Sequence, residues 1–217
     1  MPAPLLKICG LRQPEQAASI AALGVDAIGV IAVPGSPRWL APEDRPAVFA
    51  AMRRASPRCL GVLVCADPSD DELAHLDPGH GHGVIQLHGG ESPERCRQLR
   101  QRFGCAVWKA IRLRQPGDRD SIDAYSGAAD AVLLDAWVPE QLGGTGHRIP
   151  LEWLHNWHPP LPWWLAGGIT AGRAAAVLQQ LNPTGLDASS GVERSPGDKD
   201  LSQVHALLRE VRGTDHP

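Results

Sequence analysis

The sequence predicts one (β/α)₈ barrel of the TIM type, an α/β fold with parallel strands, as a single domain over residues 1–217. Short apolar runs alternate with longer helix-like stretches, and eight such units follow one another without a linker between them. The runs are almost continuously apolar, as expected when helices cover a parallel sheet. An open, doubly wound sheet is the alternative topology for the same pattern.

In the first half of the chain, residues typical of helix ends follow each apolar run. Pro14 stands where the first helix begins and Gly24 where it ends. Ser69 or Asp70 is expected to cap the third helix, and Ser92 the fourth. The predicted strands are 5–9, 26–33, 58–64 and 83–89, and the predicted helices are 14–24, 42–55, 67–76 and 92–103.

The second half repeats the pattern with shorter helical segments. A short helix is expected from about Pro150 and another from Ala171, and residues 198–211 form a closing amphipathic helix. The glycine-rich segment 142–147 is expected to be a mobile loop over a ligand or a plain flexible connection. The predicted strands are 105–111, 129–136, 162–168 and 185–191.

The composition is that of an ordinary globular protein and excludes several functions. The chain is 43% hydrophobic, 21% charged and carries a net charge of −3, so it has no basic footprint for nucleic acid or for an anionic membrane. Neither a signal peptide nor a membrane-spanning run is recognisable. Five cysteines without zinc-site spacing indicate reduced thiols, and a cytoplasmic protein is expected.

Unusual residues stand where the predicted strands end, which is where barrel enzymes carry their active sites. Lys7 and Cys9 share one face of the first strand, so the ammonium is expected to favour the thiolate. Cys9 as a small core residue is the plainer alternative. Asp135 ends "AVLLD" and could be a general acid or base, or could cap a turn.

Other strand ends supply groups suited to binding. Arg38, in "PGSPRWL", has the forked guanidinium that fits a carboxylate, although surface arginines are common. Gln86 and His88 share a face of the fourth strand, where a satisfied core histidine is the alternative. The glycine and serine turns at 166–170 and 189–191 follow strands seven and eight, where barrels often bind phosphate. No P-loop pattern and no metal-ligand set stand out.

Taken in order, these segments resemble the phosphoribosylanthranilate isomerase family of tryptophan biosynthesis. The resemblance covers almost the whole chain and is carried by "KICG", "SPR", "QLHG", "LLD", "GGTG", "LAGG" and "SSGVE". The family catalyses the Amadori rearrangement of N-(5′-phosphoribosyl)anthranilate to 1-(2-carboxyphenylamino)-1-deoxyribulose 5-phosphate. The resemblance therefore implies a (β/α)₈ isomerase with a small-molecule substrate and without a metal or organic cofactor, either a monomer or a homodimer.

The resemblance also implies roles for single residues. Cys9 would be the general base and Asp135 the general acid, while Arg38 would bind the anthranilate carboxylate. The remaining substrate-binding residues would be Gln86, His88, Gly144, Gly168, Ser190 and Gly191, with the phosphate held by the backbone around the last three.

The chain departs from the family pattern ahead of "SPR", at Gly90 and at His147, all in loops expected to wall the ligand pocket. Three alternatives stay open. The related isomerase of histidine biosynthesis uses an aspartate where Cys9 stands. Indole-glycerol-phosphate synthase needs a catalytic lysine, for which Lys109 is the candidate. A sugar-phosphate-binding barrel without catalysis is the third.

Overall fold

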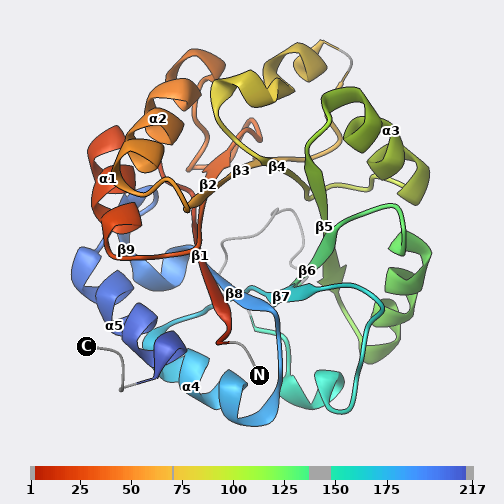
Figure 1. The fold of residues 1–217 in the computed structure, drawn as a ribbon. Helices are drawn as coiled ribbons and strands as arrows, with labels where there is room; N and C mark the ends of the chain where they lie inside the picture. The colour runs from red at the N-terminus through yellow and green to blue at the C-terminus, as the bar shows by residue number, and fades with distance from the viewer. Residues whose placement is uncertain (1–2, 70, 137–147, 214–217) are drawn as a thin grey trace.

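The computed structural model describes residues 3–69, 71–136 and 148–213, and it confirms the predicted barrel. Eight parallel strands are hydrogen-bonded in chain order, and β8 pairs with β1 to close the ring, as Figure 1 shows. In the closing register Leu6 lies opposite Leu186 and Lys7 opposite Asp187. The strands are β1 (Leu5–Cys9), β2 (Ala27–Ile31), β3 (Leu60–Cys65), β4 (Val84–Leu87), β5 (Ala106–Leu113), β6 (Ala131–Ala136), β7 (Trp163–Leu165) and β8 (Gly185–Ala188).

Helices surround the strands, and five segments within the described residues are α-helical. They are α1 (Pro14–Ala22), α2 (Arg45–Ala55), α3 (Pro93–Phe103), α4 (Ala171–Gln180) and α5 (Leu201–Arg212). The side chains of Ser92 and Thr170 accept the backbone N–H groups of the first turns of α3 and α4, as N-caps do. Helix α5 lies between α4 and α1, which completes the outer ring.

Three units carry 3₁₀ segments in place of an α-helix. These are η2 (Glu72–Leu76), η4 (Pro116–Tyr125) and η5 (Leu151–Leu154). The α-helix predicted over 67–76 is therefore wrong. Asp71 is the N-cap residue of η2 and makes no side-chain cap bond, although the Ser69 hydroxyl accepts the N–H of Glu72 at 3.4 Å. Pro78 disfavours the helical conformation for the preceding residue, Asp77, which is extended, so the helical segment ends at Leu76.

The barrel has an inner and an outer core. The inner core fills the ring and includes the contacting pair Trp108 and Trp164, whose tilted rings have centroids 4.8 Å apart. Gly185 lies against Trp164, where a Cβ would collide with the indole ring. The outer core lies between strands and helices, which explains the almost continuously apolar strand sequences.

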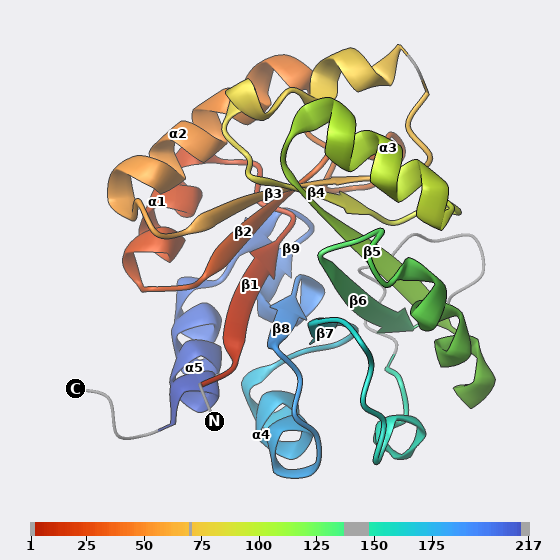
Figure 2. The same cartoon turned by 45° about the vertical axis from the view of Figure 1, so that its right-hand side comes forward.

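A small hairpin interrupts the predicted course of the last unit. β8 ends at Ala188 and is followed by η6 (Ser190–Val192), β9 (Glu193–Ser195) and β10 (Asp198–Lys199), with Gly197 at φ +84° in the turn. The closing helix predicted from residue 198 therefore begins only at Leu201, because Asp200 caps it by accepting the N–H groups of its first turn. Figure 2 shows this hairpin beside the tip of β1.

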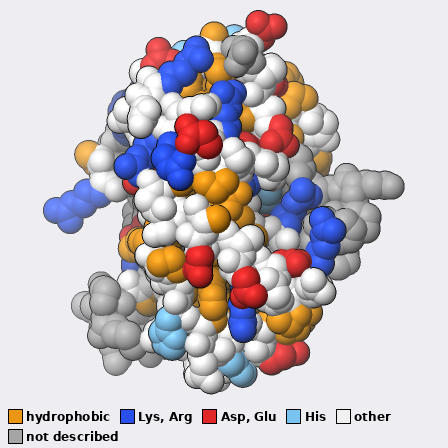
Figure 3. Space-filling view, turned by 90° about the vertical axis from the view of Figure 1, so that its right-hand side faces the viewer, with side chains coloured by type: hydrophobic (Ala, Val, Ile, Leu, Met, Phe, Trp, Pro, Cys, Tyr) orange, Lys and Arg blue, Asp and Glu red, His pale blue; other side chains and the backbone are white. Residues whose placement is uncertain are grey.

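The molecular surface carries mixed charge. On the face drawn in Figure 3, acidic and basic side chains are interspersed among polar and scattered apolar ones. Within the described ranges, no helix combines the length and the apolar character needed to cross a bilayer.

Candidate active site

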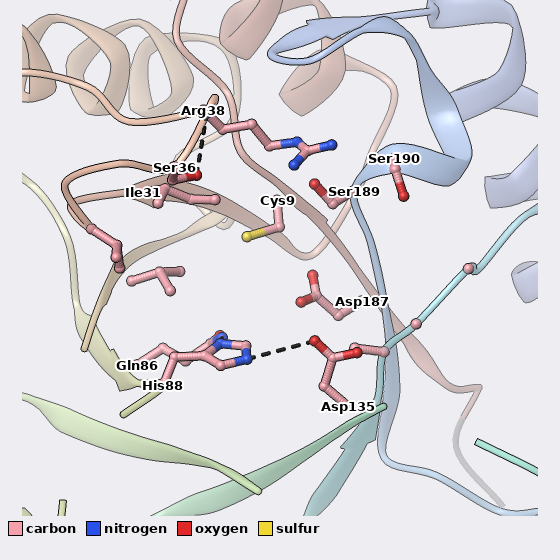
Figure 4. A pocket seen from close by; sticks show the side chains of 15 residues that line it. Cys9, Ile31, Ser36, Arg38, Gln86, His88, Asp135, Asp187, Ser189 and Ser190 are labelled. Atoms are coloured by element: carbon pink, nitrogen blue, oxygen red, sulfur yellow. Dashed lines mark hydrogen bonds and ion pairs between the residues drawn. The ribbon is translucent and has the colours of Figure 1, made fainter. Parts of the chain in front are cut away.

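A cavity opens at the C-terminal mouth of the barrel and collects most of the predicted site residues (Figure 4). Gly144 lies outside the described residues, and Gly191 follows Ser190 in η6 without lining the cavity. The cavity is also lined by Ser189 of the predicted 189–191 turn and by Asp187, which the sequence analysis did not single out. The predicted residues that line it are Cys9, Arg38, Gln86, His88, Asp135, Gly168 and Ser190.

Cys9 stands at the tip of β1 and is 6% exposed, with Lys7 two residues earlier on the same face. The Lys7 ammonium is fully buried and lies 3.0 Å from Asp187 Oδ1. Gly29, the residue opposite Cys9 on β2, leaves room for the thiol, because a Cβ there would lie 2.7 Å from Sγ. Closure of the barrel therefore gathers a thiol, an ammonium and a carboxylate at the junction of β1 and β8.

Lys7 acts on Cys9 in the expected direction, because its ammonium lowers the pKa of the thiol, but it does not decide the resting protonation state. Burial has the largest effect on the pKa of Cys9 and raises it. The Lys7 and Lys199 ammonium groups lower the pKa, but Asp187 opposes them, and the pKa stays above that of an ordinary cysteine. Cys9 is therefore a thiol at neutral pH.

Asp135 lies at the tip of β6, across the cavity from Cys9 (Figure 4). Its Oδ1 accepts the N–H of Ala136 at 2.8 Å, which fixes the orientation of the carboxyl group. Its Oδ2 lies 3.5 Å from His88 Nε2. On the other side of the imidazole, Gln86 Nε2 lies 3.4 Å from His88 Nδ1, so Gln86, His88 and Asp135 form a row along the cavity wall.

Several buried polar atoms of this cavity have no hydrogen-bond partner among the described residues. They are Gln86 Oε1, His88 Nε2 and Ser189 Oγ. The 3.5 Å contact of His88 with Asp135 is within ion-pair distance but lacks hydrogen-bond geometry. Unsatisfied buried groups are costly, so their concentration in one cavity indicates that a polar ligand satisfies them.

Arg38 reaches the cavity from the loop after β2. Its side chain is buried and donates from Nε and Nη2 to Glu193 of β9, at 2.9 and 2.7 Å. The stem of Arg38 crosses Gly10, which has φ +84° and where a Cβ would lie 2.5 Å from Arg38 Cδ. The glycine of "KICG" is therefore required both by the backbone turn and by the path of this arginine.

The loops after β7 and β8 form one side of the cavity. Gly167 and Gly168 have φ values of +87° and +61°, conformations that favour glycine. Ser190 begins η6, and at Gly191 a Cβ would collide with the Ile169 carbonyl oxygen. The two loops therefore pack directly on each other, which glycine permits.

Comparison with known proteins places this site in a family. The model of the N-(5′-phosphoribosyl)anthranilate (PRA) isomerase family matches residues 6–210. The N-(5′-phosphoribosyl)anthranilate isomerase of Thermosynechococcus vestitus is 45% identical over 209 residues, which cover 95% of this chain and 89% of the relative. This chain belongs to the N-(5′-phosphoribosyl)anthranilate isomerase family. It is accordingly an isomerase of tryptophan biosynthesis.

Solved structures of phosphoribosylanthranilate isomerases have the same fold. The enzyme from Thermus thermophilus is 34% identical and gives a TM-score of 0.79 over 95% of this chain and 98% of that chain. Another, at 23% identity, gives a TM-score of 0.80 over 97% of this chain and 99% of that chain. It was solved in complex with reduced 1-(o-carboxyphenylamino)-1-deoxyribulose 5-phosphate.

Lys109, the candidate catalytic lysine of the synthase alternative, is not among the residues that line the mouth cavity. Its buried ammonium lies 2.9 Å from Glu91 and donates to the carbonyl groups of Leu87, Gly89 and Ala110. These contacts use the donors of the ammonium to tie β5 to the loop after β4. In this member of the phosphoribosylanthranilate isomerase family, Lys109 therefore has a structural role.

Proposed function

We propose that this enzyme converts N-(5′-phosphoribosyl)anthranilate to 1-(2-carboxyphenylamino)-1-deoxyribulose 5-phosphate, with Cys9 as general base and Asp135 as general acid. The observation that supports this assignment most directly is that the thiol and the carboxyl group line one cavity from opposite sides (Figure 4). The two proton transfers of an Amadori rearrangement need such a pair, one group that donates a proton and one that removes it.

The reaction begins at the sugar ring. Asp135 protonates the furanose oxygen, the bond between this oxygen and C1 breaks, and the nitrogen lone pair forms the C=N bond of a Schiff base. The cationic nitrogen then acts as the electron sink. Cys9 removes the proton from C2, the electrons move into the C1–C2 bond, and the resulting enolamine tautomerises to the ketose. Atoms and charge balance without an oxidant or a reductant.

Cys9 acts as a base in its thiolate form, and forming the thiolate releases the thiol proton to solvent before the substrate is deprotonated. The same ammonium groups that lower its pKa, those of Lys7 and Lys199, stabilise the thiolate when it forms. Burial makes that thiolate more basic than a solvated one, which strengthens it as the acceptor of a carbon-bound proton. Asp187 holds Lys7 in place through the 3.0 Å ion pair.

The two ends of the substrate are anionic, and the cavity offers a group for each. Arg38 is assigned to the anthranilate carboxylate, because a guanidinium matches a carboxylate in geometry and charge. The phosphate is assigned to the backbone around Gly168, Ser190 and Gly191, where glycine turns allow close approach of N–H groups. Gln86 and His88 have free polar atoms toward the cavity and are assigned to the sugar between these ends.

Turnover of phosphoribosylanthranilate, followed by loss of anthranilate fluorescence, tests the assignment. We expect steady-state conversion to the ketose product, identified by its chromatographic separation from the substrate and by its absorbance, since the two isomers have the same mass. Saturable binding of the substrate without turnover would instead support a sugar-phosphate-binding barrel without catalysis.

We further propose that the enzyme works in the cytoplasm as one folded unit over residues 1–217, as a monomer or a homodimer. Sedimentation equilibrium over a concentration series distinguishes the two states of assembly.

A further inference from the structure

Glu193 is a buried carboxylate that holds a bond network just outside the catalytic cavity. Besides Arg38, it accepts the N–H of Gly197 at 3.1 Å, and Lys199 Nζ lies 2.5 Å from its Oε1. Its side chain is 4% exposed. Burial alone would raise the pKa of Glu193, but the Arg38 hydrogen bonds and the Lys199 charge lower it, so the group is ionised.

The geometry of the Arg38 contact divides the guanidinium into two edges. Glu193 takes the edge formed by Nε and Nη2, with Nε 2.9 Å from Oε1 and Nη2 2.7 Å from Oε2. Nη1 makes no hydrogen bond to any of the described residues. The edge formed by Nη1 and Nη2 is therefore the one left for a second carboxylate, and guanidinium groups bind carboxylates through such paired donors.

We propose that Glu193 is a positioning residue for carboxylate recognition: it clamps one edge of Arg38 so that the other edge is presented to the anthranilate carboxylate. The inference rests on the proposed function, in which Arg38 binds that group. An unclamped arginine would sample many rotamers, and ordering it would cost part of the binding free energy.

Two neighbours fit this role. Lys199 is fully buried and donates to Glu193 Oε1, the oxygen that also accepts from Arg38 Nε, while its Nζ lies 3.3 Å from the Ser189 carbonyl oxygen. Together with Arg38 these groups carry a net positive charge of one, which suits an anionic ligand. Gly10 leaves the stem of Arg38 the space it needs to reach Glu193.

The experiment measures the ratio of the enzyme's affinities for two probes that differ only in the carboxyl group. One probe is reduced 1-(o-carboxyphenylamino)-1-deoxyribulose 5-phosphate, and the other is the same compound without its carboxyl group. Calorimetry gives the Kd of both probes for the wild-type enzyme and for E193Q, E193D, R38A and D198N. Asp198 is the matched control, because it pairs with the exposed Arg194 on the same hairpin.

We expect R38A to abolish the preference for the carboxylated probe. E193Q should reduce that preference by about tenfold, since a preorganised charged contact is lost, and leave the affinity for the second probe near wild type. E193D keeps the charge but is one methylene shorter, so an intermediate loss is expected. D198N should match the wild type, and E193Q should raise KM more than it lowers kcat.

Each failure has a distinct meaning. If E193Q keeps the wild-type ratio while R38A loses it, the positioning role is overturned and the assignment of Arg38 stands. If R38A keeps the ratio, the carboxylate is bound elsewhere and the proposed function of Arg38 is wrong. If E193Q lost affinity for both probes equally, Glu193 would have a purely structural role. Should E193Q not fold, a wild-type ratio in E193D overturns the proposal.

Discussion

The ammonium of Lys7 and the carboxylate of Asp187 form a buried ion pair 3.0 Å long, two residues along β1 from the Cys9 thiol. The pair spans the seam at which β1 and β8 close the barrel. Its two charges act on Cys9 in opposite directions, since the ammonium lowers the pKa of the thiol and the carboxylate raises it. The seam that completes the fold therefore also adjusts the basicity of the proposed catalytic base, on which burial has the largest effect.

This arrangement predicts opposite pH effects for two substitutions. The active base is the thiolate, so kcat/KM should rise as the pH rises through the pKa of Cys9. Lys7→Met removes the cation and leaves Asp187 unpaired, which should move this rise to higher pH. Asp187→Asn leaves Lys7 unopposed, which should move it to lower pH.

Profiles of kcat/KM against pH for the wild type and both variants test this pair of shifts. Circular dichroism at each pH verifies that the variants are folded, because each leaves one buried charge without its partner. If both variants shifted the profile in the same direction, the rise of kcat/KM with pH would reflect the titration of a group other than Cys9.

The proposed acid and base predict a second set of results. Asp135→Asn and Cys9→Ser should each lower kcat by about 10²–10⁴-fold, the usual contribution of a positioned acid or base. KM should change far less, because each group acts mainly in the transition state. Stopped-flow fluorescence in single turnovers separates the chemical step from product release. Near-normal kcat in either variant would remove that residue from its role.

Gly10 predicts a third result, with Gly35 as a built-in control. Both residues have a positive φ, +84° and +82°, so alanine at either position should cost about 1–2 kcal/mol of stability through backbone strain. Only at Gly10 would the new methyl group also meet Arg38, since nothing lies within 4 Å of a Cβ at Gly35. Gly10→Ala should therefore raise KM, whereas Gly35→Ala should lower stability alone.

Urea unfolding and steady-state kinetics on these two variants provide the comparison. Equal KM values for Gly10→Ala and Gly35→Ala would show that Arg38 tolerates displacement or that it does not contact the substrate.

Much of the architecture was predictable because parallel strands covered by helices leave a strong apolar pattern. The placement of Cys9 and Asp135 at strand tips followed from the same pattern, and the cavity contains both. The shared face of Lys7 and Cys9 was also predictable from strand alternation. The resting state of the thiol was not, because it depends on burial and on Asp187, which lies 180 residues after Lys7 in the chain.

Asp187 and Glu193 show why the rest of the site was missed. "GLDA" has the signal that identified Asp135, a carboxylate among apolar residues near a strand end, but the strand is short and its partner Lys7 is distant in sequence. Glu193 belongs to the recognised "SSGVE" motif, yet its partner Arg38 lies 155 residues earlier. The predicted closing helix from residue 198 included only the second strand of this hairpin, Asp198–Lys199, and the sequence predicts no strand at Glu193. Contacts between the first and last units of the barrel form only when the barrel closes, so the short sequence segments that hold each residue do not reveal them.

His82 predicts a loss of stability in mild acid, away from the active site. It precedes β4 at the N-terminal end of the barrel, where its Nε2 lies 3.1 Å from the Leu76 carbonyl oxygen. Nε2 therefore donates, and Nδ1 is buried without a partner among the described residues. Burial lowers the pKa of His82 to about 4, because a second N–H in this place would carry an unsatisfied charge.

The sign of the effect follows from this lowered pKa. The unfolded chain binds the proton near pH 6.5, whereas the folded protein resists it until about pH 4. The stability contributed by neutral His82 is complete above pH 6.5 and is lost as the pH falls toward 4, by about 3 kcal/mol in all. His82→Gln should reduce this loss, whereas the exposed His75→Gln should keep it. Urea unfolding at intervals from pH 7.5 to 4 measures both slopes, and identical slopes for the two variants would show that another group controls the acid sensitivity.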